Sequence, residues 1–217
     1  MNSPLIQLLV LAGIAVFLIL RLRSVLGTRE GFEKPHVVEA STARRPNLEV
    51  IEGGPDRDIV DHVPEHSPAA FAFAAMKKAD PDFNVGGFLQ GARGAYEMIL
   101  MAFERGDLSQ VKPFIAPEVY DAFSGVIAQR EADGLTVEAT FIGVSELGVQ
   151  AAEFDPASKE AEITLRMTAE FTYVVRDRGG DIVEGSPSQP RRQRDVWTFA
   201  RSMTSGDPNW MLVETGE

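Results

Sequence analysis

The sequence predicts an α+β domain that follows an N-terminal transmembrane helix. Three observations support this fold class. Residues 4–20 are apolar almost without interruption, residues 67–132 repeat apolar side chains at helical spacing, and residues 162–175 alternate apolar and polar side chains as a strand does. Because the helical segments come before the strands, the order favours helices grouped on one side of an antiparallel sheet.

Composition limits the classes of function. The chain has 217 residues, 44% of them apolar, so we expect one folded domain with additional segments. The 32 acidic residues outnumber the 21 basic ones and give a net charge of -11, which disfavours binding to nucleic-acid phosphates. The absence of cysteine excludes disulfides and thiolate chemistry. No dinucleotide fingerprint or Walker A loop occurs, so we expect no cofactor. Because of the acidic charge balance, we also expect no nucleic-acid partner.

Residues 4–26 are predicted to form a transmembrane anchor. The first 20 residues carry no charged side chain, and in lipid such a segment satisfies its backbone hydrogen bonds only as a helix. Positive charges follow the apolar run instead of preceding it, and no small-residue cleavage site is present, which favours an uncleaved anchor over a secretory signal. The flanking Arg21, Arg23 and Arg29 place the N-terminus outside and the rest of the chain in the cytoplasm.

Residues 27–66 are interpreted as a disordered, proline-rich and acidic linker. Prolines recur along the segment, and neither helical nor strand periodicity is sustained. Such a stretch buries too little apolar surface to offset the entropy cost of ordering. All three histidines of the chain lie in it, namely His36, His62 and His66, so we expect no preorganised metal site there.

Residues 67–79 predict a short amphipathic helix, with Ser67 as N-cap and Pro68 in the first turn. Docking on the domain, lying on the membrane surface and binding a partner are alternative roles for this helix. The candidate surface contacts are aromatic and basic side chains of this helix and of a later arginine run: Phe71, Phe73, Lys77, Lys78, Arg191, Arg192 and Arg194. The arginine run also fits a solvated strand edge.

The domain is predicted to occupy residues 80–217. Apolar residues at helical intervals predict a first long helix within 83–106, with Gly106 as its C-terminal cap. Three glycines lie near one face of this helix: Gly87, Gly91 and Gly94. Each glycine costs roughly 1 kcal/mol relative to alanine in a helix interior, so another group is expected to approach that face closely.

Four strands are predicted after a short turn and a second helix. The turn spans 111–115 and the second helix 117–132; the strands span 136–153, 162–175, 192–203 and 210–214, with a break expected near Gly143 or Gly148. Turn-forming sequences separate the strands, so consecutive strands should pair as antiparallel hairpins.

The apolar row of these strands is a candidate pocket. Its members are Ile163, Leu165, Met167, Phe171, Tyr173, Trp197 and Phe199. If the interior is open, these side chains would line a hollow for a hydrophobic ligand such as a lipid chain or an exposed peptide. If it is closed, the same side chains form an ordinary core.

Several segments resemble the Tim44-like domain family, which includes the mitochondrial inner-membrane import-motor tether and bacterial membrane-anchored relatives. The resemblance is carried by the anchor followed by "RLRSVLGTREGFE", by "AFERGDLSQVKPFIAPEVYDAF" and its preceding helix, and by "DVWTFAR" and "NWMLVE". It covers roughly residues 83–217. It implies a fold like that of nuclear transport factor 2, an NTF2-like cone in which helices lie over a strongly bent sheet.

The resemblance also implies a function. We expect a single-pass adaptor or scaffold at the bacterial inner membrane that presents a cytoplasmic domain to a protein partner, a chaperone or a membrane complex. Protein translocation and membrane-protein assembly are the processes it suggests, and a hydrophobic-ligand or lipid-binding domain is the alternative. The mitochondrial proteins also carry a long basic segment before the domain, which this chain lacks.

An enzyme is the rival class, because cone-shaped folds also house isomerases and dehydratases. Such chemistry needs a titratable side chain inside the hollow. The predicted domain contains no histidine, and on the long strand Glu162 and Glu170 fall on the face opposite the apolar row. Tyr173 is the one polar side chain on that row, and a buried tyrosine usually serves packing. We therefore expect no catalytic residue.

Overall fold

The computed structural model describes residues 54–216. The predicted anchor at 4–26, its flanking arginines and most of the predicted linker lie outside the described residues. Within 54–216, no helix combines the length and the apolar character needed to cross a bilayer.

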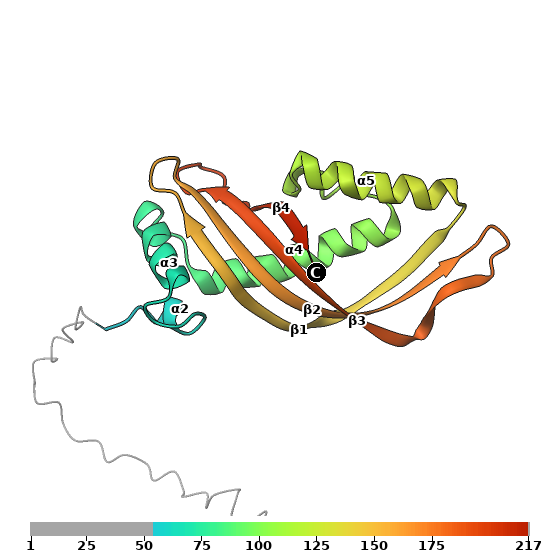
Figure 1. Ribbon diagram of the computed structural model, residues 1–217, viewed down its shortest axis with the longest axis horizontal. Coiled ribbons are helices and arrows are strands. Elements are labelled where there is room, and N and C mark those ends of the chain that lie inside the picture. The colour runs from blue at the N-terminus through green and yellow to red at the C-terminus, as the bar shows by residue number, and fades with distance from the viewer. Residues whose placement is uncertain (1–53, 217) are drawn as a thin grey trace, which may run out of the picture. The chain divides into compact units, whose positions relative to one another are not determined.

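The described residues form a helix layer and one antiparallel sheet (Figure 1). The helices are α2 (Arg57–Val60), α3 (Pro68–Ala79), α4 (Val85–Arg105), the 3-10 helix η1 (Lys112–Phe114) and α5 (Pro117–Ala132). The strands are β1 (Thr136–Phe154), β2 (Glu160–Arg176), β3 (Ile182–Ser202) and β4 (Met211–Gly216), and they are hydrogen-bonded in that order. The prediction of helices followed by antiparallel hairpins is confirmed.

The ends of the helices are set by local sequence. Ser67 Oγ accepts a hydrogen bond from the N–H of Ala70 at the start of α3, and Asn84 Oδ1 accepts one from the N–H of Gly87 at the start of α4. Helix α4 ends at Gly106, whose φ of 77° is left-handed and therefore suits glycine. These caps fix both ends of α4.

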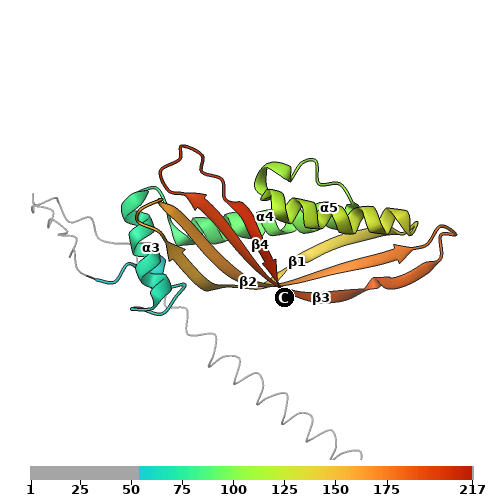
Figure 2. The ribbon, with the colours of Figure 1, turned by 45° about the horizontal axis from the view of Figure 1, so that its top comes forward.

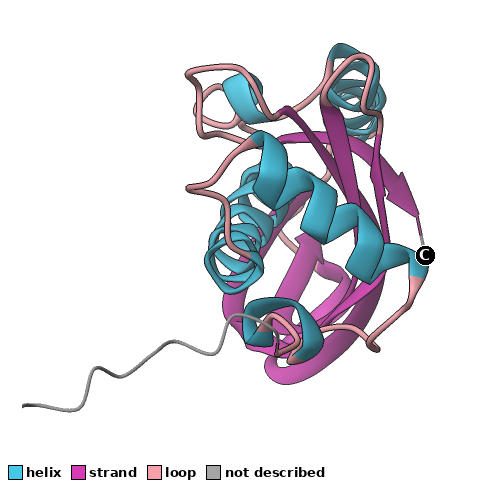
Figure 3. Cartoon of the chain, turned by 90° about the vertical axis from the view of Figure 1, so that its left-hand side faces the viewer, coloured by secondary structure: helices cyan, strands magenta, loops and turns pink. Residues whose placement is uncertain are grey.

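The sheet bends strongly along its length. Figures 1 and 2 show β1, β2 and β3 curving past the helices, and Figure 3 shows the sheet curving around them in a view along the long axis. Strand β1 carries three register shifts, the first between Phe141 and Gly143. A bulge bends a strand without ending its pairing. The break expected near Gly143 or Gly148 is therefore a bend in one continuous strand.

The core lies between α4 and the inward face of β2 and β3. Ile163, Leu165 and Met167 of β2 are completely buried. Aromatic contacts join the two layers: the rings of Tyr96 and Trp197 have centroids 4.6 Å apart, and those of Phe88 and Phe199 are in an edge-to-face arrangement at 6.2 Å. Helix α3 also packs on β1, with Phe73 and Met76 completely buried, as the domain-docking alternative predicts.

The end of the predicted linker is folded in this structure. Residues 57–60 form α2, and Ile59 and Val63 are buried in the core cluster. The carboxylate of Asp58 accepts hydrogen bonds from the N–H groups of Val85 and Gly86 at 2.8 and 2.9 Å. Local periodicity is too short here to predict a helix, whereas these tertiary contacts supply its stability.

Strand β3 begins ten residues before its predicted start at 192. The early part, with the sequence "IVEGSPSQP", is polar and contains prolines, which disfavour a strand. It pairs with β2 through Val175↔Glu184 and Tyr173↔Ser186, and the register then jumps to Phe171↔Arg191. The prolines fall in the residues skipped by that jump, so they remove no ladder hydrogen bond.

Candidate functional site

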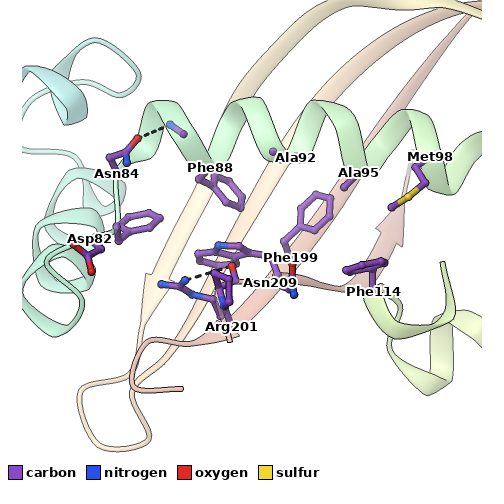
Figure 4. Close-up of a pocket in the computed structure, with 15 residues that line it drawn as sticks. Asp82, Asn84, Phe88, Ala92, Ala95, Met98, Phe114, Phe199, Arg201 and Asn209 are labelled. Carbon is purple, nitrogen blue, oxygen red and sulfur yellow. Dashed lines mark hydrogen bonds between the residues drawn. The ribbon is translucent and has the colours of Figure 1, made fainter. Parts of the chain in front are cut away.

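An open groove runs along the N-terminal half of α4, and we call it the α4 groove. Its volume is about 390 Å³. The lining residues come from α4, the turn before it, η1, β3 and the loop before β4: Asp82, Phe83, Asn84, Gly87, Phe88, Gly91, Ala92, Ala95, Met98, Phe114, Phe199, Arg201, Pro208, Asn209 and Trp210. Figure 4 shows the α4 side chains facing Phe199 and Arg201 across this space.

Aromatic rings form the wall at one end of the groove. The Trp210 ring centroid lies 4.6 Å from that of Phe88 and 5.9 Å from that of Phe83. Phe83 and Phe88 are buried, whereas Trp210 is half-buried and exposes part of its indole. Aromatic side chains in this setting offer a large apolar contact area to a ligand.

Small residues open the middle of the groove. A Cβ added at Gly91 or Gly94 would meet no atom within 4 Å, so no other described part of the chain covers these positions. Gly91 lines the groove and Gly94 lies outside it. Met98, 40% exposed, extends the apolar surface beyond them. The close approach expected at the glycine face is made at Gly87, where an added Cβ would lie 2.6 Å from Asn84 Oδ1, and is not made by the described residues at Gly91 or Gly94.

The other notable feature of the groove is a buried guanidinium. Arg201, whose side chain is 10% exposed, forms an ion pair with Asp80, and its Cζ lies 5.3 Å from the Trp210 ring centroid. Its Nη1 donates to the carbonyl of Pro208 at 3.4 Å. Within residues 54–216, Arg201 Nε is the one buried side-chain nitrogen or oxygen without a hydrogen-bond partner. A buried donor without a partner is destabilising, so this end of the groove has a hydrogen-bond donor that lacks an acceptor.

The residues of the predicted apolar pocket lie mostly in a closed core. Six of the seven are buried: Ile163, Leu165, Met167, Phe171, Trp197 and Phe199. Tyr173 is half-buried, and its hydroxyl donates to Glu184. Only Phe199 lines the α4 groove. The open apolar space therefore lies beside the predicted row rather than within it.

The predicted surface contacts do not form one patch. Phe71 is 63% exposed and Lys78 is exposed, but Phe73 belongs to the core. Lys77 Nζ is paired with Asp56 and Asp58 at 2.7 and 2.8 Å. These four belong to α3, which packs on β1 at one edge of the sheet, whereas the arginine run lies on β3.

Each arginine of that run lies on the exposed part of β3. Arg191 Cζ lies 5.1 Å from the Tyr173 ring centroid, and Arg192 pairs with Glu170 at 3.0 Å. Arg194 is exposed on the opposite face of the strand from its neighbour Asp195. The run therefore matches the solvated strand edge that was its alternative interpretation.

Sequence reasoning missed a buried polar pair. Tyr96 Oη of α4 donates to Asp195 Oδ2 of β3 at 2.5 Å, and Gln193 Nε2 donates to both carboxylate oxygens at 3.1 Å. Burial, together with the hydrogen bond and charge of Asp195, raises the pKa of Tyr96, so the phenol stays protonated as the donor. The available signal was the alternation of β3, which places Asp195 on the same inward row as Trp197 and Phe199.

Fold and groove together define the class of protein: an α+β domain with helices on a strongly curved antiparallel sheet and an open apolar groove along one helix. Within this class, the chain belongs to the Tim44-like domain family, because the family model described as "Tim44-like domain" matches residues 69–217. The predicted resemblance is confirmed, and the match also includes nearly all of α3.

Two curated relatives carry the name TIM44. The chain is 20% identical over 164 residues to mitochondrial import inner membrane translocase subunit TIM44-1 of Arabidopsis thaliana, covering 73% of this chain and 34% of that protein. It is 25% identical over 140 residues to mitochondrial import inner membrane translocase subunit TIM44 of Homo sapiens, covering 63% and 30%. This chain thus spans about a third of the length of these relatives.

One solved structure shows a more distant likeness. The crystal structure of the intermembrane space region of the chloroplast protein ARC6 matches with a TM-score of 0.41 and 13% sequence identity. The match covers 59% of this chain and 94% of that chain.

Proposed function

We propose that this protein is a membrane-anchored adaptor that holds a protein partner beside the bacterial inner membrane, in protein translocation or membrane-protein assembly. The observation that carries this proposal is membership of the Tim44-like domain family. The two curated relatives of the chain described above are named as subunits of an inner-membrane translocase. We assign no catalytic step to the chain.

The anchoring part of the proposal rests on the sequence. The apolar run of the first 20 residues is long enough to enter a bilayer as a helix, and the three arginines that follow it favour the cytoplasmic side for the domain. The linker between anchor and domain would let the domain reach partners that differ in height above the membrane.

The α4 groove is the proposed docking surface, and its proposed occupant is the apolar face of a partner helix. Gly91 and Ala95 leave room for a second helix to approach α4 closely, while Trp210 and Met98 supply apolar surface at either side. An amphipathic helix that lies in an apolar groove is a recurrent mode of peptide recognition. The expected partner segment is therefore a helix with an apolar stripe.

A site-specific crosslinking experiment tests this function. A photoreactive residue at Met98 faces the groove, and one at the adjacent exposed Glu97, which does not line the groove, is the matched control. In membranes, the full-length chain should yield a crosslinked polypeptide from position 98 and not from 97. A variant without residues 4–26 should lose that product. The same products from both positions, or none from either, would contradict the proposal.

A second candidate function is the binding of a hydrophobic ligand with a polar acceptor at one end. The specific observation in its favour is the unpaired, buried Arg201 Nε beside the aromatic end of the groove. Native mass spectrometry of the full-length protein released from detergent checks it. A ligand that is retained by the wild-type protein and lost in Gly91→Leu would favour this function. A wild-type protein without any retained ligand would contradict it.

A further inference from the structure

Asp195 is a buried carboxylate without a counter-charge in the described part of the chain. It is 8% exposed, and none of the ion pairs formed within residues 54–216 includes it. Its neighbours Tyr96 and Gln193 supply neutral donors only. Aspartate is seldom buried this deeply unless it is paired, because an uncompensated charge inside a protein is destabilising.

The side chain of Asp195 lines a second pocket, which we call the Asp195 pocket. This pocket has a volume of about 240 Å³ and is lined by Leu100, Phe103, Phe123, Gln193, Asp195, Trp197, Thr215 and Gly216. Its walls are thus aromatic and aliphatic, contributed by α4, α5 and β3. Thr215 and Gly216 of β4 are the exposed members of this lining.

A carboxylate that lines a largely aromatic pocket is suited to an organic cation. The aromatic faces attract a cation through their quadrupoles, and the carboxylate supplies the opposite charge. Asp195 Oδ1 accepts one hydrogen bond, from Gln193, and so keeps capacity for a donor from a ligand. A neutral apolar group in the same place would leave the buried charge uncompensated.

We propose that the Asp195 pocket receives a lysine or arginine side chain of a partner polypeptide. This inference rests on the proposed adaptor function, since it names the chemistry by which the partner is recognised. A long apolar stem that ends in a charged head matches a pocket whose walls are apolar and whose acid is buried. The net charge of -11 over the whole chain also favours approach of a basic partner segment.

The two tryptophans of the chain provide a direct test, because Trp197 lines the Asp195 pocket and Trp210 lines the α4 groove. Full-length protein labelled with 5-fluorotryptophan gives two fluorine resonances, which Trp210→Phe assigns. Titration with Nα-acetyl-arginine amide should shift the Trp197 signal and leave the Trp210 signal in place. Nα-acetyl-citrulline amide, the neutral analogue of nearly the same shape, should bind at least about tenfold more weakly.

Asp195→Asn is the decisive variant, and Glu214→Gln is its control. Both changes remove one negative charge, but Glu214 is exposed on β4 and does not line the pocket. Asp195→Asn should abolish the preference for arginine over citrulline, and Glu214→Gln should leave it unchanged. Equal binding of the two ligands, no saturable binding, or an unchanged preference in Asp195→Asn would each overturn the proposal. Choline or ethanolamine binding as tightly as arginine would overturn the polypeptide assignment in favour of a lipid headgroup.

Failure of this inference can be told apart from failure of the adaptor function. If the crosslink from Met98 forms and Asp195→Asn does not weaken it, the partner docks without the cation and the inference fails alone. If the arginine probe binds as described but no crosslink forms, the Asp195 pocket stands and the adaptor function fails.

Discussion

The carboxylate of Asp58 accepts a hydrogen bond from the backbone N–H of Val85 at 2.8 Å, although the two residues are separated by 27 positions in the chain. It also accepts from Gly86 and pairs with Lys77. Backbone N–H groups in the first turn of a helix lack partners within the helix. Asp58 therefore caps α4 from another element and joins the folded end of the predicted linker to the helix that carries the α4 groove.

Removing this cap should destabilise the domain. We expect Asp58→Ala to lower the free energy of unfolding by about 1–2 kcal/mol, since it removes a capping acceptor and a charge that favours the helix N-terminus. Asp61→Ala, an exposed position just after α2, should change it by less than about 0.5 kcal/mol. Urea unfolding followed by tryptophan fluorescence measures both. Equal losses of unfolding free energy in the two variants would show that the contacts of Asp58 with the start of α4 do not stabilise the domain.

The same contact predicts an acid dependence. Burial raises the pKa of Asp58, but hydrogen bonds from Lys77, Gly86 and Val85 and the charge of Lys77 outweigh it and hold the pKa below the usual 3.8. The unfolded chain then binds more protons than the folded one between the two pKa values. The stabilisation that Asp58 contributes is therefore fully present above the pKa that Asp58 has in the unfolded chain. It is lost as the pH falls through the lower pKa that Asp58 has in the folded chain.

Accordingly, the difference in unfolding free energy between wild type and Asp58→Ala should be constant near neutral pH. It should begin to shrink below about pH 4, where the unfolded carboxyl takes up its proton. Urea unfolding of both proteins from neutral pH to about pH 3 checks this. A difference that shrinks between neutral pH and about pH 5 would assign the acid sensitivity to another group.

Regular local patterns made most of the fold predictable from sequence. The strict alternation of Ile163, Leu165 and Met167 with polar neighbours identifies β2, and the caps Ser67 and Gly106 locate helix ends to within a residue or two. These elements are determined by interactions within a few residues of chain. The start of β3 is different, because its polar residues are ordered only by pairing with β2.

The candidate sites were harder to predict for a related reason. The inward row of β2 was correctly recognised as apolar, but whether such a row is open or closed depends on what packs against it. Here α4 covers the row, and the open space arises instead between Gly91 of α4 and the loop that carries Trp210. The alternation of β3 places Asp195 on the inward face, but no local pattern indicates its partner Tyr96, which lies 99 positions away. Such contacts follow from topology and not from periodicity.

Tyr96→Phe should measure how much the hydrogen bond from Tyr96 to the buried carboxylate of Asp195 contributes to stability. The change removes one hydrogen bond to Asp195 without changing the ring packing, and we expect a loss of about 1–3 kcal/mol in unfolding free energy. Tyr120→Phe is the matched control, because Tyr120 is half-buried and its hydroxyl makes no hydrogen bond with another side chain or backbone group within residues 54–216.

Tryptophan fluorescence during urea unfolding again provides the measurement. Tyr120→Phe should stay within about 0.5 kcal/mol of wild type. The arginine preference of the Asp195 pocket should persist in Tyr96→Phe, because the carboxylate remains. A Tyr96→Phe protein as stable as wild type would show that the hydrogen bond from Tyr96 contributes no net stability.

Gly91→Leu and Gly94→Leu distinguish partner binding in the α4 groove from partner binding elsewhere on α4. Both glycines lie in the interior of α4 with open space where a Cβ would be, so both substitutions should raise stability, by about 0.5–1 kcal/mol through helix propensity. Only Gly91 lines the α4 groove. A leucine there fills the space proposed for a partner helix, whereas a leucine at 94 lies outside it.

The crosslink from Met98 should therefore fall at least about tenfold in Gly91→Leu, which corresponds to a loss of about 1.4 kcal/mol in binding, and remain near the wild-type level in Gly94→Leu. Thermal unfolding of both variants confirms that the domain is intact. If both leucines reduce the crosslink equally, the partner contacts the exposed face of α4 and not the groove; if neither does, the groove is not the docking surface.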